Sequence, residues 1–327
     1  MSQRSVALDN LPARPPMRAL VFTDPGTMEL QDVARPEADA DSVLLEVRAA
    51  GICGSELHGF RHVGFRKPPL IMGHEFAGVT PDGRRVVVNP LVSCAACDMC
   101  RQGLPQICRY RELIGAQRPG GFAENVVVPA DSIHDLPADM TWETAAMVEP
   151  LANAVHAWNR VDLAGTERVA IIGAGTIGLV CLLAGLSRGL TGFTVVDRSP
   201  NRLALAERLG AASCATELAG EYDVVLDAVG SQLTREAAVD RVRPGGTCVW
   251  IGLVDNHPGF DGNQLVRFEK RVVGSFAYTP QEFAAALALA SQVDLGWTTP
   301  IALEESQRVF MALAEGATQP VKAVIRL

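Results

Sequence analysis

Four cysteines within 15 residues form the densest group of metal-binding side chains in the sequence. They follow the spacing C-x2-C-x2-C-x7-C, at Cys94, Cys97, Cys100 and Cys108. Four thiolates this close can enclose one tetrahedral ion, and a closed sulfur shell suits a structural Zn²⁺ with no open position for a substrate. An iron–sulfur cluster is the competing interpretation, since C-x2-C-x2-C also occurs in ferredoxins. The long fourth spacing, and Arg109 where ferredoxins have proline, favour zinc.

A glycine-rich turn predicts a second kind of chemistry, the binding of a dinucleotide. Gly173, Gly175 and Gly178 follow the apolar run RVAII and open an apolar helical segment. In this G-x-G-x-x-G pattern the first glycine makes the turn, the second lets a pyrophosphate approach the backbone, and the third lets the helix pack on the strand. Thr176 and Ile177 lie in the first turn of the expected helix, whose free N–H groups attract phosphate.

The carboxylate that we expect to select the cofactor is Asp197. It ends the expected strand FTVVD, 19 residues past Gly178. A carboxylate at this place can accept hydrogen bonds from both ribose hydroxyls and repels a 2′-phosphate. Arg198 and Arg202 keep NADP binding possible. The expected cofactor is therefore NAD, with NADP less favoured.

Three further segments, far apart in the sequence, carry metal-ligating side chains. They are GICGSELH at 51–58, GHE at 73–75 and VEPLANAVH at 148–156, and each contains at least two side chains of the kinds that bind metals. Each alone is more typical of packing than of metal binding. In order with the four cysteines, the glycine pattern and the terminal strand, they resemble the zinc-dependent medium-chain dehydrogenase/reductase family, the alcohol dehydrogenase superfamily. The resemblance runs from Met17 to Leu327, and the Glu-Pro pair at 149–150 is typical of the polyol, sorbitol and threonine dehydrogenase branch.

The resemblance implies an open, catalytic Zn²⁺ site in addition to the structural one, hence two Zn²⁺ per chain. Its protein ligands would be Cys53, His74 and Glu149, with water or substrate in the fourth position. Pro150 suits the first turn of a helix, so Glu149 would lie at a helix start, where the dipole keeps its carboxylate ionised. Glu75 matches a carboxylate that approaches the ion when water leaves, or that only hydrogen-bonds near it.

The resemblance also implies a path for the proton of the alcohol. Ser55 would accept that proton, and His58 would pass it through the cofactor ribose to solvent. Glu56 stands where the family usually has aspartate, and we expect it to support a zinc ligand. The other histidines are expected to have structural or surface roles: His62, His134, His156 and His257.

Two domains are needed to position these residues. Up to about Pro150, short apolar runs separated by Gly and Pro predict β-strands, and beyond it strands alternate with helices, which predicts a parallel sheet. The expected fold class is α/β. We expect a doubly wound Rossmann domain over 150–275 and a β-rich, GroES-like, partly barrel-like catalytic domain over 1–149 and 276–327. The active site would lie in the cleft between them.

Composition and charge limit the classes of binding partner that we expect. The chain has 327 residues, 48% of them hydrophobic and 20% charged, which is typical of a globular protein of about two domains. A net charge of −8 opposes binding to nucleic acid or to an anionic membrane. Glycines interrupt the apolar run 169–186, so a strand and a helix explain it better than a membrane span. Residues 1–16 lack the apolar core of a secretory signal, so we expect a loose arm and a cytoplasmic protein.

These observations predict an NAD-dependent zinc alcohol dehydrogenase that interconverts a secondary alcohol and its ketone, or a primary alcohol and its aldehyde. By resemblance it would be a homodimer or homotetramer, paired through the strands GTCVWIGL and RVVGSFAY. A zinc-free enone or quinone reductase is an alternative that both metal sites oppose. An inactive NAD-binding protein is another, opposed by the intact set of catalytic residues.

The substrate is expected to differ from that of sorbitol dehydrogenases. Those enzymes commonly carry an aromatic residue and an arginine where this chain has Gly59 and Ala277. Without these two groups, preference for open-chain hexitols should fall. Arg61, Arg66 and Lys67 could attract a carboxylate or phosphate, although a solvated basic loop is the favoured interpretation.

Overall fold

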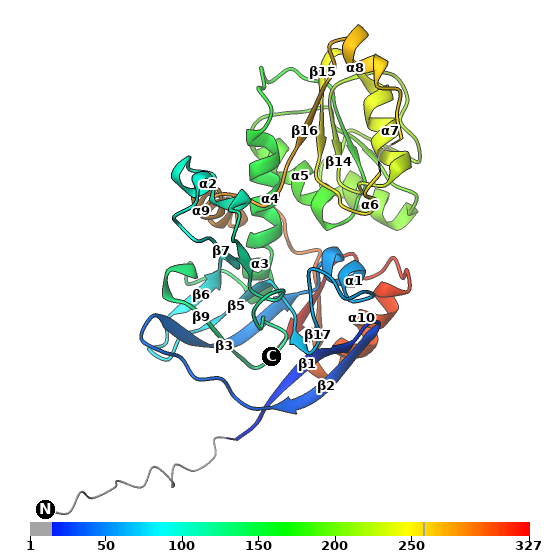
Figure 1. Cartoon of the computed structure of the whole chain (residues 1–327). Helices are drawn as coiled ribbons and strands as arrows, with labels where there is room; N and C mark the ends of the chain where they lie inside the picture. Colours follow the sequence, from blue (N-terminus) through cyan, green and yellow to red (C-terminus); the bar gives the residue numbers. More distant parts are fainter. Residues whose placement is uncertain (1–14, 258) are drawn as a thin grey trace, which may run out of the picture.

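The computed structural model describes residues 15–257 and 259–327, which form a β-rich part and an α/β part joined by helices (Figure 1). The arm predicted for residues 1–16 therefore lies, apart from its last two residues, outside the described part of the chain. Within the described residues, no helix combines the length and the apolar character needed to cross a membrane.

The main sheet of the β-rich part has seven strands. Their order is β10-β6-β5-β3-β18-β17, with β9 pairing with β3 outside this path. Because β18 pairs antiparallel with β3, the end of the sequence returns to the sheet that strands from the N-terminal half form. The strands are β3 (Ser42–Gly51), β5 (Glu75–Val79), β6 (Arg85–Val88), β9 (Asn125–Pro129), β10 (Ile133–Asp135), β17 (Thr299–Ala302) and β18 (Ala323–Arg326).

A second sheet of three strands shares its core with the first. Leu20 and Phe22 of this sheet and Leu45 of β3 belong to one buried cluster, which gives the partly barrel-like arrangement that the sequence predicts. The three-stranded sheet contains β2 (Thr27–Val33), β1 (Met17–Asp24) and β4 (Leu70–Ile71), and a separate pair contains β7 (Leu91–Val92) and β8 (Glu112–Leu113). The helical elements of this part are α1 (Gly54–Gly59), α2 (Asp98–Arg101), η1 (Pro105–Ile107), η2 (Ala130–Ser132), α3 (Trp142–Ala146), η3 (Leu303–Glu305) and α10 (Ser306–Ala314).

The α/β part contains a parallel sheet of six strands in the order β13-β12-β11-β14-β15-β16. Numbered within this part, the order is 3-2-1-4-5-6, which is the Rossmann order and confirms the predicted fold class. The strands are β11 (Val169–Ile172), β12 (Thr194–Val196), β13 (Ser213–Ala215), β14 (Tyr222–Asp227), β15 (Val242–Trp250) and β16 (Arg271–Gly274). The helices of this part are α5 (Thr176–Ser187), α6 (Pro200–Arg208), α7 (Gln232–Arg241) and α8 (Asn263–Arg267), and the two helices at its border with the β-rich part are α4 (Val148–Asn159) and α9 (Pro280–Ala290).

The apolar run 169–186 forms β11 and most of α5. All four residues of β11 are buried, as expected for a central strand covered on both faces. Helix α5 packs closely because it has no side chain at Gly185, where a Cβ atom would lie 2.4 Å from the ring of Phe193. A strand and a helix therefore account for a run that hydropathy alone could assign to a membrane.

Helices α4 and α9 pack against each other and connect the two parts. Our division by sequence assigns α4 to the Rossmann domain and α9 to the catalytic domain. The contact includes a bond between His156 Nδ1 and Glu282 Oε2 at 2.9 Å, and Asn159 donates to the other oxygen of Glu282 at 2.8 Å. His156 thus has the structural role expected of it. Helix α4 begins two residues before the predicted start at Pro150.

Candidate active site

Three side chains that bind metals well meet at the ends of two paired strands. Cys53 follows β3 and precedes the first turn of α1, while His74 directly precedes β5 and Glu75 is its first residue. The pairing of Gly51 with Glu75 aligns these segments. The donor atoms of Cys53, His74 and Glu75 all lie within 4.8 Å of one another. Sulfur, imidazole and carboxylate donors in an incomplete shell fit a catalytic Zn²⁺.

Glu56 hydrogen-bonds two members of this group. Its side chain is fully buried, and its Oε1 lies 2.7 Å from His74 Nδ1. Its Oε2 accepts a bond from the backbone N–H of Cys53 at 3.0 Å. Although burial raises the pKa of Glu56, the charge and hydrogen bond of His74 bring it below its usual value. A carboxylate at Nδ1 leaves Nε2 of His74 free for a metal, so Glu56 fits the supporting role expected of it.

Ser55 lies beside the metal-binding group. Its hydroxyl is on the exposed side of α1 and donates to the sulfur of Cys53 at 3.4 Å. His58 is exposed further along the same short helix. A hydroxyl next to a metal ligand and open to solvent can receive a proton from an alcohol bound there.

Arg66 differs from its expected place in a solvated loop. It is 4% exposed and reaches into the site, where its Nη2 donates to Ser55 Oγ at 3.3 Å and its Nη1 donates to the carbonyl oxygen of Ser55 at 3.0 Å. The interpretation of a solvated loop is therefore wrong for Arg66, while Arg61 and Lys67 are exposed as that interpretation requires. Gly59 makes the burial possible, because a Cβ atom there would lie 2.7 Å from Nη1.

Glu149 lies close to the metal-binding group but outside it. Its Oε1 accepts bonds from the hydroxyl of Tyr278 at 2.9 Å and from Asn153 Nδ2 at 3.2 Å. Burial raises the pKa of Glu149 to about 7; the charge of His74 lowers this pKa, and that of Glu75 raises it. The position at a helix start therefore does not keep this carboxylate as readily ionised as expected. The structure thus groups Glu75 with Cys53 and His74, whereas the resemblance implies Glu149 as the third ligand.

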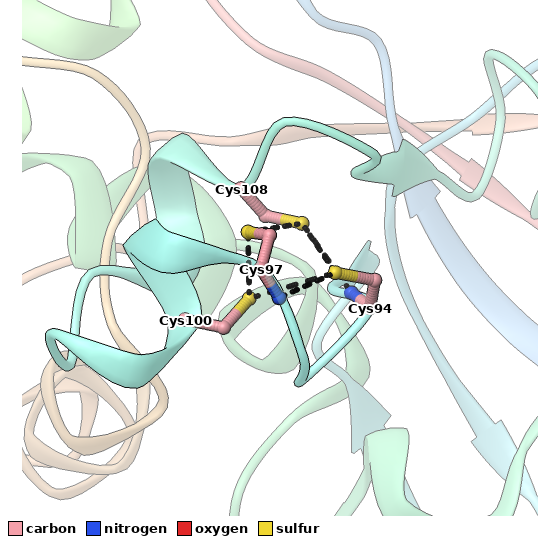
Figure 2. A group of neighbouring side chains, drawn as sticks. All are labelled: Cys94, Cys97, Cys100 and Cys108. Carbon is pink, nitrogen blue, oxygen red and sulfur yellow. Dashed lines mark hydrogen bonds between the residues drawn. The ribbon is translucent and has the colours of Figure 1, made fainter.

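The four-cysteine lobe has the geometry of a closed site (Figure 2). Its sulfur atoms point toward one another, with Cys94 and Cys108 sulfurs 3.4 Å apart and those of Cys97 and Cys100 3.6 Å apart. The backbone N–H of Cys100 lowers the pKa of the Cys97 thiol to about 6, while burial raises that of Cys100 to about 12. Four converging sulfurs with a thiol poised to ionise fit one tetrahedral Zn²⁺.

The glycine pattern lies at the turn between β11 and α5. Gly173 has a φ of +98°, and a Cβ atom at Gly178 would lie 1.7 Å from the carbonyl oxygen of Gly173. A Cβ atom at Gly175 would meet no atom within 4 Å, so this backbone faces open space at the helix N-terminus. Such a cradle fits a pyrophosphate. Thr176, the first residue of α5, donates to the carbonyl oxygen of Val321 at 3.4 Å, and Ile177 follows it.

Asp197 follows β12 at the edge of this cradle. Its Oδ2 accepts from the N–H of Ala174 at 2.8 Å, and its Oδ1 accepts from the N–H of Ser199 at 2.8 Å. Arg202 Nη1 lies 3.9 Å from Oδ2. The carboxylate is therefore fixed next to the glycine turn, with lone pairs left for ribose hydroxyls and a cation within reach of a 2′-phosphate.

Comparison with known proteins identifies the family. The profile of the alcohol dehydrogenase GroES-like domain matches residues 39–138, and that of the zinc-binding dehydrogenases matches residues 176–292. The chain belongs to the zinc-dependent medium-chain dehydrogenase family. It is accordingly an NAD(P)-dependent oxidoreductase of the alcohol dehydrogenase type, and the family resemblance noted in the sequence is confirmed.

Individual relatives of this dehydrogenase cover nearly all of it. D-arabitol-phosphate dehydrogenase of Enterococcus avium is 32% identical over 88% of this chain and 91% of its own. The solved structure of galactitol-1-phosphate dehydrogenase of Escherichia coli is 27% identical, with a TM-score of 0.88, and covers 95% of this chain and 100% of that one. A structure described as a zinc-binding dehydrogenase of Sinorhizobium meliloti 1021, bound to NADP, is 27% identical, with a TM-score of 0.89, over 96% and 100% of the two chains.

A buried lysine of the dehydrogenase site, like Tyr278, has no counterpart in the sequence-based predictions. Lys322, just before β18, is 1% exposed, and its Nζ bonds both Glu75 Oε2 and, at 3.0 Å, the carbonyl oxygen of Ile52. Gly51 leaves the room, because a Cβ atom there would lie 2.9 Å from Lys322 Cε. Burial lowers the pKa of Lys322, but the Glu75 carboxylate raises it by more, and the net result is a pKa above the usual value. The lysine therefore stays charged. A lysine before an apolar strand carries no sequence signal of such burial.

Proposed function

We propose that the protein oxidises a secondary alcohol to its ketone, or reduces the ketone, with Cys53, His74 and Glu149 holding the catalytic zinc. The observation that carries this proposal is the group of Cys53, His74 and Glu75 with the hydroxyl of Ser55 3.4 Å from the Cys53 sulfur. Glu149 lies within electrostatic reach of this group and can turn from Tyr278 toward an ion. Glu75, paired with Lys322, is the carboxylate that would approach the ion when water leaves.

The chain's own residues supply a path for the proton. Zn²⁺ held here would act as a Lewis acid on the substrate oxygen, and NAD⁺ would supply the hydride acceptor. Ser55 accepts the proton from the alcohol, since its hydroxyl faces solvent beside the metal ligands. His58, exposed on the same helix, would pass the proton from the cofactor ribose to solvent. Glu56 keeps the imidazole of His74 in one orientation throughout.

We further propose two Zn²⁺ per chain and NAD as the preferred cofactor, bound at Gly173, Gly175, Thr176, Ile177 and Gly178. The S. meliloti structure bound to NADP shows that relatives accept a 2′-phosphate. In this chain the Asp197 carboxylate lies at the end of β12, where the ribose of a dinucleotide reaches in this fold, and its charge opposes that phosphate.

Asp197→Ala is expected to weaken NAD⁺ binding about tenfold or more and to improve the use of NADP⁺ relative to NAD⁺. The variant loses an acceptor for the ribose hydroxyls and the charge that repels a 2′-phosphate, while Arg202 remains. The measurement is kcat/KM for both cofactors. Arg202→Gln is the matched control: it removes the nearby cation and is expected to lower NADP⁺ use, in contrast to Asp197→Ala. A wild-type enzyme that already prefers NADP⁺ would show that Arg198 or Arg202 governs the choice.

The substrate is proposed to be a functionalised or cyclic secondary alcohol. The relatives bear the names of enzymes for polyols and polyol phosphates, such as D-arabitol phosphate and galactitol 1-phosphate. Arg66 occupies the space next to Gly59, and no aromatic side chain is present at that position. Since a group that would hold a neighbouring hydroxyl is replaced by a cation, sorbitol and xylitol should be poor substrates.

A panel of alcohols tests this function. Hexitols, simple secondary alcohols, hydroxy amino acids and sugar phosphates are incubated with NAD⁺, and NADH is followed by its absorbance. The expected result is oxidation of at least one secondary alcohol, with kcat/KM for sorbitol more than tenfold below the best substrate. Absence of hydride transfer from every alcohol would contradict the proposed function. A sorbitol value within tenfold of the best would contradict the substrate argument alone.

The assembly and location are proposals as well. We propose a homodimer or homotetramer in the cytoplasm, without nucleic-acid or membrane partners. Strand β16 is an edge of the parallel sheet, and large apolar side chains in the segment between β15 and β16 are exposed, including Leu253, Val266 and Phe268. Apolar groups beside an open sheet edge suit pairing with a second copy.

The division into 150–275 and 1–149 with 276–327 also remains a proposal, with α4 and α9 at its boundary.

A further inference from the structure

Arg66 is a buried cation beside Ser55, next to the metal-binding group of Cys53, His74 and Glu75. Its three hydrogen bonds join Nη2 to Ser55 Oγ at 3.3 Å, Nη1 to the Ser55 carbonyl at 3.0 Å and Nε to the Gly115 carbonyl at 3.4 Å. A guanidinium carries five N–H donors. Two of them therefore have no partner among the described residues, at a side chain that is only 4% exposed.

The charge of Arg66 also lacks an ion-pair partner. In the part of the chain that the structure describes, no carboxylate lies within 4 Å of its guanidinium. Glu56, whose pKa this cation helps to lower, already bonds His74, the N–H of Gly73 and the N–H of Cys53. A buried arginine is normally paired, because removing a charge from water is costly. Besides its hydrogen bonds, the guanidinium of Arg66 has the ring of Phe65 nearby, with the ring centroid 5.8 Å from Cζ. A buried cation without a carboxylate partner, beside the hydroxyl of Ser55, is suited to an anion that arrives with the substrate.

The distances around Ser55 allow an anionic group of the substrate to lie close to the guanidinium of Arg66. Ser55 Oγ is the expected partner of the reacting hydroxyl and lies 3.3 Å from Arg66 Nη2. A hydroxyl bonded to Ser55 would therefore lie within about 6 Å of the guanidinium. At that separation and an effective dielectric constant of about 20, a full negative charge changes binding by roughly 100-fold.

We propose that Arg66 is a specificity-determining residue that favours secondary alcohols carrying an anionic oxygen group, a carboxylate or a phosphate, near the reacting carbon. This inference rests on the proposed function. It assigns the selection to Arg66 rather than to the basic loop as a whole, since Arg61 bonds the carbonyl of Ala314 and Lys67 is exposed.

The test compares substrates that share a carbon skeleton and differ in charge. Xylitol and sorbitol are each measured with the corresponding terminal monophosphate and aldonate, and the quantity of interest is the ratio of kcat/KM for the anionic compound to that for the neutral one. We expect this ratio to be at least ten in the wild type for the phosphates, the aldonates or both, which identifies the anion. In Arg66→Met it should fall at least tenfold, and Arg66→Lys should retain most of it.

Two further variants separate charge selection from damage to the site. Lys67→Gln removes a neighbouring exposed cation and should leave the ratio within about threefold of wild type. Gly59→Ala keeps the charge but places a Cβ atom 2.7 Å from Nη1, so it should lower the ratio by displacing the guanidinium. A wild-type ratio near one, an unchanged ratio in Arg66→Met, or an equal fall in Lys67→Gln would overturn the inference while simple secondary alcohols are still oxidised. Failure to oxidise any alcohol would instead overturn the proposed function, and the inference with it.

Discussion

Replacing His74 with alanine is expected to lower kcat/KM for alcohol oxidation by about 10³-fold or more. The substitution removes the imidazole proposed as a zinc ligand and, among the described residues, leaves the buried carboxylate of Glu56 with only its two backbone N–H partners. Loss of a Lewis acid at the reacting oxygen costs several kcal/mol of transition-state stabilisation, and each 1.4 kcal/mol is about tenfold in rate. NADH binding, followed by fluorescence, should change little because the glycine cradle belongs to the other sheet.

His62→Ala is the matched control for this experiment. His62 is exposed in the loop that follows α1 and should leave kcat/KM within about twofold of wild type. Zinc analysis should find one ion fewer in His74→Ala than in the control. An alanine variant that keeps more than a tenth of the wild-type activity would contradict a catalytic metal at His74.

Cys100→Ser should remove the second zinc and destabilise the protein. It opens a shell of four sulfur atoms that all lie within 4.8 Å of one another, and structural zinc sites contribute directly to folding free energy. We expect one Zn²⁺ per chain instead of two and a Tm lower by roughly 5 °C or more. Elemental analysis and thermal unfolding measure both effects. A chelator should likewise empty the open site first, abolishing activity while the fold is retained.

Cys214→Ser controls for the loss of a thiol as such. Cys214 is half-buried in β13, outside both metal-binding groups, so this variant should keep two zinc ions. Iron in the purified protein, fewer than one zinc in active enzyme, or an unchanged Tm in Cys100→Ser would each contradict a structural zinc.

The features predicted correctly from the sequence are those encoded locally. Gly173 and Gly178 announce a turn whose geometry depends on a few neighbouring atoms, and the four cysteines lie within 15 residues, so their convergence needs little help from the rest of the fold. The Rossmann strand order follows from the alternation of strands and helices along one continuous segment. Element ends were less accurate, as the start of α4 shows.

The features that escaped prediction depend on approach between distant segments. The burial of Arg66 follows from the gap at Gly59 and from the carbonyl of Gly115, 49 residues away. Lys322 reaches Glu75 across 247 residues, and Tyr278 reaches Glu149 across 129. Hydropathy assigns charged side chains such as Arg66 and Lys322 to the surface, because the partners that make burial tolerable are invisible in the local sequence.

The pairing of β18 with β3 has a consequence for the order in which the protein acquires its structure. Lys322 contacts the carbonyl of Ile52 across 270 residues, so the surroundings of the open metal site are complete only after one of the longest loop closures in the chain. The cysteine lobe and the Rossmann segment require only local or continuous stretches and can become ordered while that sheet is still open. During biosynthesis the lobe should therefore capture its zinc early, and the catalytic ion should enter last, after the chain has closed around its ligands.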